Sequence, residues 1–166
     1  MMPASDINVS KHAAILLKIL NKITLFNGLN NGSKLSLISI CKEHRFEEGE
    51  IIFCLNDESD RMYIVITGYI DVILANNQVV ATIKPNSMFG EMGVFSGEKR
   101  SATVIARTRT VCFSIERKGL DSLLLKNAVL GRDLLRNVVT MLAAKINENN
   151  IMIEELTKEL ETKNRV

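Results

Sequence analysis

Short β-branched runs, evenly spaced between Ile51 and Ile115, constrain the fold of this chain more than any other feature. Valine, isoleucine and aromatic residues dominate these runs and favour strands. The runs are Ile51–Phe53, Met62–Ile66, Tyr69–Leu74, Val79–Ile83, Ala102–Ala106 and Thr110–Ile115. Turn-forming residues separate them at Asn56-Asp57, Thr67-Gly68, Asn76-Asn77, Pro85-Asn86 and Arg107–Arg109. Short strands at even spacing predict a closed or two-layered antiparallel structure.

Helical periodicity flanks the β region on both sides. Residues 10–24 carry a helical stripe with Ser10 as its N-cap, and a second short helix is expected from Ser33. This second helix is expected to bury Leu35, Ile38 and Cys41 before the charged run at 42–45. After Ile115, a short helix is followed by a long one from about Arg132 to Thr162. We therefore expect one domain made of an N-terminal helical segment (1–45), a β region (46–116) and C-terminal helices (117–166).

The long helix contains a heptad seam. The a positions are Val139, Ile146, Ile153 and Leu160, and the d positions are Leu135, Leu142, Asn149 and Leu156. Branched residues at a with leucine at d favour a parallel two-stranded coil, so residues 132–162 predict a homodimer. The alternative is an amphipathic helix folded against its own β region. Asn149 interrupts the apolar seam, and an amide buried there can fix the register.

Composition excludes several classes of function. The chain has 166 residues, 24% charged and 46% hydrophobic, with a formal net charge of +2, which gives no case for a nucleic-acid or membrane surface. Three distant cysteines, Cys41, Cys54 and Cys112, indicate reduced thiols, and the N-terminus carries no secretory signal, so we expect a cytoplasmic protein. No nucleophile has a paired base, and His12 and His44 belong to no metal-type spacing. We expect neither an enzyme nor a bound metal or cofactor.

The segment from Phe89 to Val104 combines the parts of an anion site. Gly90 allows close backbone approach, and the free N–H groups of a helical turn after it, including that of Met92, favour an anion. Arg100 can hold two phosphate oxygens. Glu91 would repel a phosphate, so its partner is a hydroxyl such as a ribose 2′-OH. Together with neutral donors from Ser101 and Ala102, these residues predict a site for a small cyclic phosphate.

This segment resembles the phosphate-binding cassette of the cyclic nucleotide-binding domain family, with Phe89-Gly90-Glu91 followed by Arg100-Ser101-Ala102-Thr103. The resemblance extends over Gly49–Phe53, Met62–Val65 and Gly68–Val72. It implies a mainly β fold, an eight-stranded antiparallel β-roll with N-terminal helices and a long C-terminal dimerisation helix. It also implies that Glu91 binds the ribose 2′-hydroxyl and Arg100 the cyclic phosphate, with Gly90, Ser101 and Ala102 completing the cradle.

Two glycines that the family often has are replaced here by Asn56 and Asn86. Asparagine tolerates a left-handed backbone better than other residues with a side chain, so both turns should be preserved.

The resemblance also suggests contacts to the base. In the family's activators the long helix lends polar side chains to the purine edge, which places Asn149 there, while Val72 and Ile83 are candidates for apolar walls. A core role explains Val72 and Ile83 equally well. The expected ligand is cAMP, because the resemblance is nearest to the bacterial activators. The hydroxyl of Ser101 could serve cGMP as well.

The function expected from the sequence is a cyclic nucleotide sensor that signals through its C-terminal helix to an unidentified protein partner. The sequence ends at Val166 without a DNA-reading module, so direct binding to nucleic acid is not expected, although a piece of a longer protein would read the same. One alternative is a nucleotide-independent dimerisation or adaptor module, in which Arg100 is simply paired with Glu91 or Glu98. Another is a sensor of a different anion.

Overall fold

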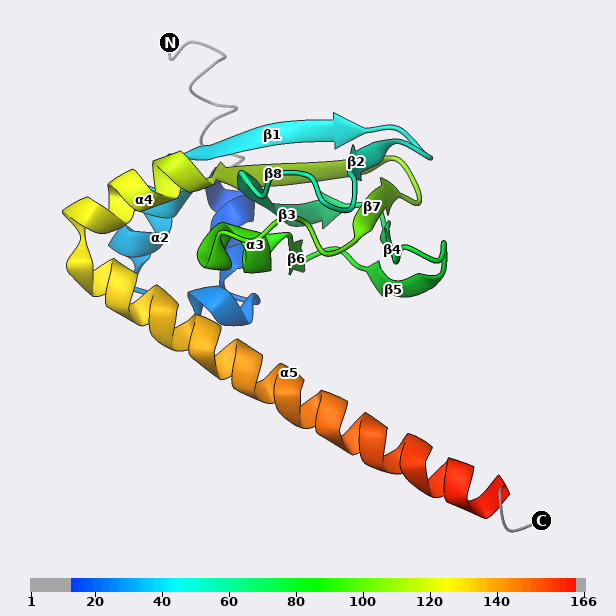
Figure 1. Ribbon diagram of the computed structural model, residues 1–166. Helices are drawn as coiled ribbons and strands as arrows, with labels where there is room; N and C mark the ends of the chain where they lie inside the picture. The colour runs from blue at the N-terminus through cyan, green and yellow to red at the C-terminus, as the bar shows by residue number, and fades with distance from the viewer. Residues whose placement is uncertain (1–12, 164–166) are drawn as a thin grey trace, which may run out of the picture.

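The computed structural model describes residues 13–163 as two antiparallel sheets flanked by helices (Figure 1). A helix at 13–20 comes first. The elements that follow it are η1 (Thr24–Phe26), α2 (Asn31–Ile38), β1 (Cys41–Phe46), β2 (Ile51–Phe53), β3 (Arg61–Thr67), β4 (Ile70–Ile73), β5 (Val79–Ile83), β6 (Met88–Phe89), α3 (Glu91–Ser96), β7 (Thr103–Ala106), β8 (Thr110–Glu116), α4 (Arg117–Lys126) and α5 (Ala128–Lys163).

The strands form two four-stranded sheets, in the orders β1-β8-β3-β6 and β2-β7-β4-β5. Strand β8 pairs with β1 from Cys41↔Ile115 to Phe46↔Thr110, and with β3 on its other side. All pairings are antiparallel, and the two sheets face one another as the layers of a roll (Figure 1). The predicted eight-stranded antiparallel β-roll with helices at both ends is confirmed.

Alternation along β3 divides the interior into two apolar clusters. Met62 and Ile64 point to the helices and join the cluster formed by the N-terminal helices, α4 and the start of α5. Tyr63 and Val65 point the other way, into the space between the sheets. Because successive side chains of a strand face opposite sides, one strand can build both cores.

The prediction for residues 33–46 is wrong in part. Helix α2 ends at Ile38, and the charged run belongs to strand β1 rather than to the end of a helical segment. The expected core residue Leu35 is 50% exposed, and Leu37 is buried in its place. The charged residues of this run do not resemble a strand in the sequence. In the fold, Lys42 has a partner on β8, because its Nζ lies 2.8 Å from Glu116 Oε1. The expected N-cap, Ser10, lies outside the described residues.

The asparagines predicted to preserve tight turns do adopt left-handed backbone. Asn56 has φ 69° and Asn86 has φ 64°, and Asn77 shares this conformation at 62°. These turns therefore form without a glycine.

Helix α5 is a single helix of 36 residues with two different roles along its length. Its first turns pack on the domain, where Leu130 and Leu134 are buried and Asn137 Nδ2 donates to the carbonyls of Leu25 and Asn27, each at 2.8 Å. The rest runs past the roll (Figure 1). Seven apolar residues of the predicted seam are exposed in the single chain, namely Leu135, Val139, Leu142, Ile146, Ile153, Leu156 and Leu160. Within residues 13–163, no helix is long and apolar enough to cross a membrane.

Leu134 should be a main anchor of α5. We expect Leu134→Ala to lower the free energy of unfolding by about 3 kcal/mol, because it removes a fully buried side chain and leaves a cavity. Urea unfolding followed by circular dichroism measures this loss. The control is Leu125→Ala, at a side chain 88% exposed, which should change stability by less than about 0.5 kcal/mol. Equal effects of the two substitutions would contradict the packing described here.

Candidate functional site

Gly90 connects the end of β6 to the start of α3 at one side of the site. Gly90 has φ 74°, and a Cβ at this position would come within 2.6 Å of Arg100 Nη1. Glycine is therefore needed both for the left-handed turn and for the close approach of the arginine. One turn later, a Cβ at Gly93 would collide with the side chain of Ser59, so α3 packs tightly on the loop before β3.

Arg100 lies at the centre of the site and is only 5% exposed. Its Nη1 donates to the carbonyl of Gly90 at 2.9 Å and its Nη2 to the carbonyl of Arg61 at 2.5 Å. The guanidinium carbon lies 4.1 Å from the centre of the Phe53 ring, which is a cation–π distance. The Nε of Arg100 is buried and has no hydrogen-bond acceptor among residues 13–163. Nε is thus the one guanidinium nitrogen without a hydrogen-bond partner among these residues.

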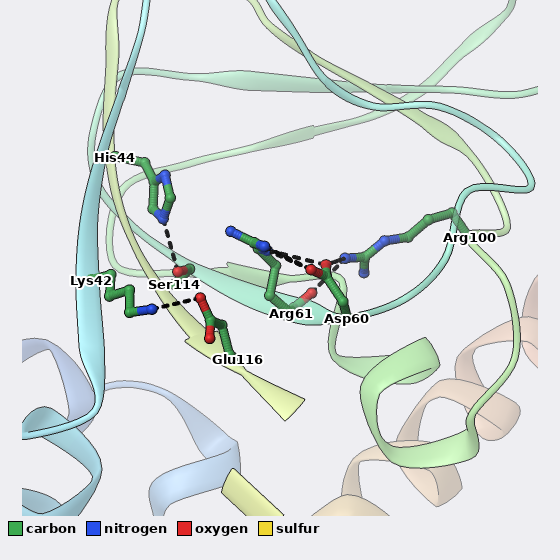
Figure 2. Close-up of polar contacts among 7 residues, drawn as sticks. All are labelled: Lys42, His44, Asp60, Arg61, Arg100, Ser114 and Glu116. Carbon is green, nitrogen blue, oxygen red and sulfur yellow. Dashed lines mark hydrogen bonds and ion pairs between the residues drawn. The ribbon is translucent and has the colours of Figure 1, made fainter. Parts of the chain in front are cut away.

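A carboxylate that the sequence analysis missed stands beside this arginine. Asp60 Oδ1 lies 3.9 Å from Arg100 Nη2, while Asp60 Oδ2 accepts from Arg61 Nη2 at 2.6 Å. Figure 2 shows Arg61 and Arg100 approaching Asp60 from two sides. The hydrogen bond from Arg61 holds the pKa of Asp60 below its usual range. The suggested pairing of Arg100 with Glu91 or Glu98 is wrong, since the carboxylate near Arg100 is Asp60.

Glu91 lies at the start of α3, and its carboxylate is partly buried. Burial raises its pKa, and the charge of Arg100 opposes this only as a smaller effect. In the described part of the chain, Glu91 forms no ion pair within 4 Å. Its charge is therefore poorly compensated by the protein itself.

An aromatic cluster lines the roll beside Arg100. Tyr63 and Phe89 stack with ring centres 5.0 Å apart, and Phe53 lies 5.9 Å from Phe89. Val72 and Ile83 pack against the same cluster, half-buried. The structure thus brings both predicted wall residues to the apolar surface that includes Phe53, the ring under Arg100. It does not separate their predicted wall role from a core role.

His44 is half-buried at the end of this cluster. Its Nε2 lies 2.9 Å from Ser114 Oγ (Figure 2). Its ring stacks on Phe46. Desolvation and the nearby Arg61 lower its pKa, so the neutral ring is favoured.

The remaining predicted site residues fall in two places. Ser101 is exposed and Ala102 is buried directly after Arg100, and Met92 lies on α3 with 60% of its surface exposed. Asn149 is different. The groove next to Glu91 reaches Leu142 on α5, and Asn149 lies seven residues beyond it, about 10 Å further along the helix. The single chain does not bring Asn149 to Arg100, so base contact by Asn149 stays a prediction.

Known proteins share the sequence pattern of this chain. The sequence profile of the "Cyclic nucleotide-binding domain" matches residues 43–127. The chain is 24% identical over 162 residues to the cAMP-dependent protein kinase regulatory subunit of Candida albicans, covering 95% of this chain and 35% of that protein. It is 33% identical over 124 residues to the cGMP-dependent protein kinase of Plasmodium berghei, covering 73% of this chain and 14% of that protein. The chain thus spans about a third or less of the length of these two relatives.

Solved structures share the fold. A cyclic nucleotide-binding domain from Methylobacillus flagellatus KT is 27% identical with a TM-score of 0.72, and the match covers 83% of this chain and 80% of that chain. The regulatory domain of Toxoplasma gondii PKA, crystallised with cAMP, has a TM-score of 0.65 at 22% identity, with 68% of this chain and 44% of that chain covered. The profile match includes both Glu91 and Arg100 and covers more than half of the chain. The chain belongs to the cyclic nucleotide-binding domain family.

Proposed function

We propose that this chain is a regulatory module that binds a cyclic nucleotide, cAMP in the first place, and passes the bound state to a protein partner through its C-terminal helix. The observation that carries the proposal is the buried Nε of Arg100, which has no acceptor among the described residues. A buried donor without a partner costs about 1–3 kcal/mol, so a fold that keeps one needs a reason. A phosphate oxygen is the acceptor that suits a guanidinium best.

Arg100 is already oriented for this task. Two carbonyls and the Phe53 ring hold the guanidinium plane. Binding then requires little loss of side-chain entropy, because the arginine is ordered before the ligand arrives. Asp60 offsets one of the two positive charges of Arg61 and Arg100 and does not occupy the Nε, so a positive charge is left for an anion.

Glu91 has the complementary role. A carboxylate cannot contact the phosphate without repulsion, but it can accept a hydrogen bond from a ribose hydroxyl. Burial already disfavours its charge, as its raised pKa indicates. A hydroxyl that donates to Glu91 would reduce this cost of burying the charge. The reduction adds to the free energy of binding.

The identity of the base is the finer part of the proposal. The relatives described above include a cAMP-dependent regulatory subunit and a cGMP-dependent kinase. We favour cAMP, in line with the bacterial activators that the cassette resembles, and the exposed hydroxyl of Ser101 is the feature through which cGMP would compete.

Signalling follows from the exposed seam of α5. We propose that residues 132–162 of two copies form a parallel coiled-coil dimer, with Asn149 facing Asn149 of the second copy. Ligand can shift the packing of α5 only if the alternative packings differ in affinity for the nucleotide.

A second candidate function is a nucleotide-independent dimerisation module. The observation in its favour is that Arg100 has a structural task, since its two amino groups hold the carbonyls of Gly90 and Arg61. The raised pKa of Glu91, which shows that its charge is only partly compensated, and the free Nε of Arg100 favour the sensor instead, and calorimetry decides between the two functions.

Titration of nucleotide-free protein with cAMP and cGMP is the direct test. We expect saturable binding at about one nucleotide per chain, and we expect Arg100→Leu to weaken it at least tenfold, which corresponds to about 1.4 kcal/mol or more. Arg109→Leu removes an exposed arginine outside the site and is the control. Because Arg100 also supports the backbone, binding is compared below the melting temperature of each variant, with folding checked by circular dichroism. No binding of either nucleotide by the wild type would favour the adaptor module.

Glu91→Gln should have opposite effects on stability and binding. In the folded protein the pKa of Glu91 lies above its ordinary value of 4.5, so ionisation destabilises the fold at neutral pH. We expect the amide to raise the melting temperature at pH 7, with the difference vanishing as the pH falls below about 4.5, where both side chains are neutral. Nucleotide affinity should fall at least tenfold, because the charged acceptor is lost. Differential scanning calorimetry across this pH range measures the first effect, with the exposed Glu98→Gln as control, and a lower melting temperature at pH 7 would contradict it.

A further inference from the structure

An apolar groove lies between the cassette helix α3 and the start of α5. Its volume is about 270 Å³. Six apolar residues line it together with Glu91 and Ser96, namely Met92, Phe95, Leu135, Val138, Met141 and Leu142. Met92 is 60% exposed although the residues around it are apolar. A methionine left open in an apolar groove is typical of a surface that another apolar group covers.

The groove is continuous with the exposed seam of α5. Leu135 and Leu142 belong to both, because they line the groove and are the first two d positions of the heptads. Val138 lies between them at a g position, where it flanks the seam on the side of α3. Any helix that packs along the seam from its first heptad must therefore pass beside Met92.

The seam itself indicates what that helix is. Three of its four a positions are β-branched and three of its four d positions are leucine, a pattern that favours two parallel strands in register. Asn149 strengthens this choice, because an amide at a d position is best paired with an identical amide across a twofold axis. A second copy of this chain supplies that amide at the correct level.

We propose that α5 of a second copy of this chain closes the groove, so that Met92 of one copy contacts the first heptads of the other. The proposal rests on the coiled-coil dimer proposed above and adds α3 to its interface. Helices packed in this way lie about 8–10 Å apart. In a parallel coil, the g residue Val138 of one copy faces the e residue Ala143 of the other, which is small and exposed. Ala143 of the second copy therefore allows α5 to approach α3 closely.

This geometry joins the dimer to the cassette. Met92 directly follows Glu91, so a side chain that binds nucleotide and one that binds the second copy are neighbours on a six-residue helix. A shift of α3 on ligand binding would change both contacts together, and dimerisation and nucleotide affinity should then be thermodynamically linked.

Sedimentation equilibrium of the full chain without nucleotide tests the contact. We expect Met92→Glu to weaken dimerisation at least tenfold, because a carboxylate would be buried against the second copy. Leu156→Glu, in the seam far from α3, should abolish the dimer, and Leu125→Glu, at an exposed residue of α4, should leave it unchanged. A wild-type dimer constant for Met92→Glu, or equal weakening by Leu125→Glu, would overturn the groove contact while leaving the coiled coil standing. A wild type that stays monomeric at all concentrations would overturn both.

A second measurement does not depend on a substitution. In dimers mixed from a copy with labelled methionine methyls and a copy with labelled alanine and valine methyls, we expect intermolecular nuclear Overhauser effects from Met92 to Ala143 or Val139 of the second copy. Contacts of the Met92 methyl confined to its own chain would overturn the proposal.

Discussion

The guanidinium of Arg100 is the interaction on which the site depends, because it joins three separate parts of the chain. Its amino groups hold the backbone before α3 and at the start of β3, and its plane covers Phe53 on the other sheet. The backbone of Arg100 is tied down as well, since its N–H donates to Asp57 and its carbonyl accepts from Asn56. A buried cation is tolerated when its charge is met by acceptors, and here both terminal nitrogens donate to backbone carbonyls while Nε has no partner among the described residues. The site is therefore preorganised by the same contacts that close this end of the roll.

The sequence predicted the parts of the structure that local chemistry determines. Strands β2 and β5 were predicted with their observed bounds, and Asn56 and Asn86 adopt the expected left-handed turns, because periodicity and backbone preference act within a few residues. Strand β1 was missed because its residues are mostly charged, and one of the contacts that hold it, between Lys42 and Glu116 of β8, joins residues more than 70 positions apart. Asp60 was missed for the same reason, since its approach to Arg100 is created by the fold and by no local pattern. Long-range pairing of charges is what single-sequence reasoning lacks.

Helix α5 shows how one helix can serve two surfaces. Leu134 and Leu135 are adjacent, yet one is buried in the domain and the other is exposed, because successive residues on a helix point about 100° apart. The packing face ends near Met141, where the domain ends, while the heptad pattern continues for several more turns. An apolar stripe that extends beyond the part of α5 packed on the domain would be exposed to water in a monomer, which is unfavourable. The alternative of a packed helix thus holds for the first turns of α5, while the coiled coil stays a prediction for the exposed seam.

The proposed coupling between nucleotide and α5 would pass through helix α3. Helix α3 carries Glu91 at its start, and two of its later residues, Val94 and Phe95, belong to the core cluster that holds the first turns of α5. A Cβ at Gly93 would clash with Ser59, so α3 packs closely on the loop before β3, and we expect this short helix to move as a unit. A ligand that draws Glu91 toward a ribose hydroxyl would therefore tilt or shift the whole short helix, and with it the apolar surface offered to α5. The ligand can shift α5 only as far as its affinity differs between the positions of α3 before and after this movement. Burial makes ionised Glu91 costly, as its raised pKa indicates, and relief of this cost on binding would contribute to that difference in affinity.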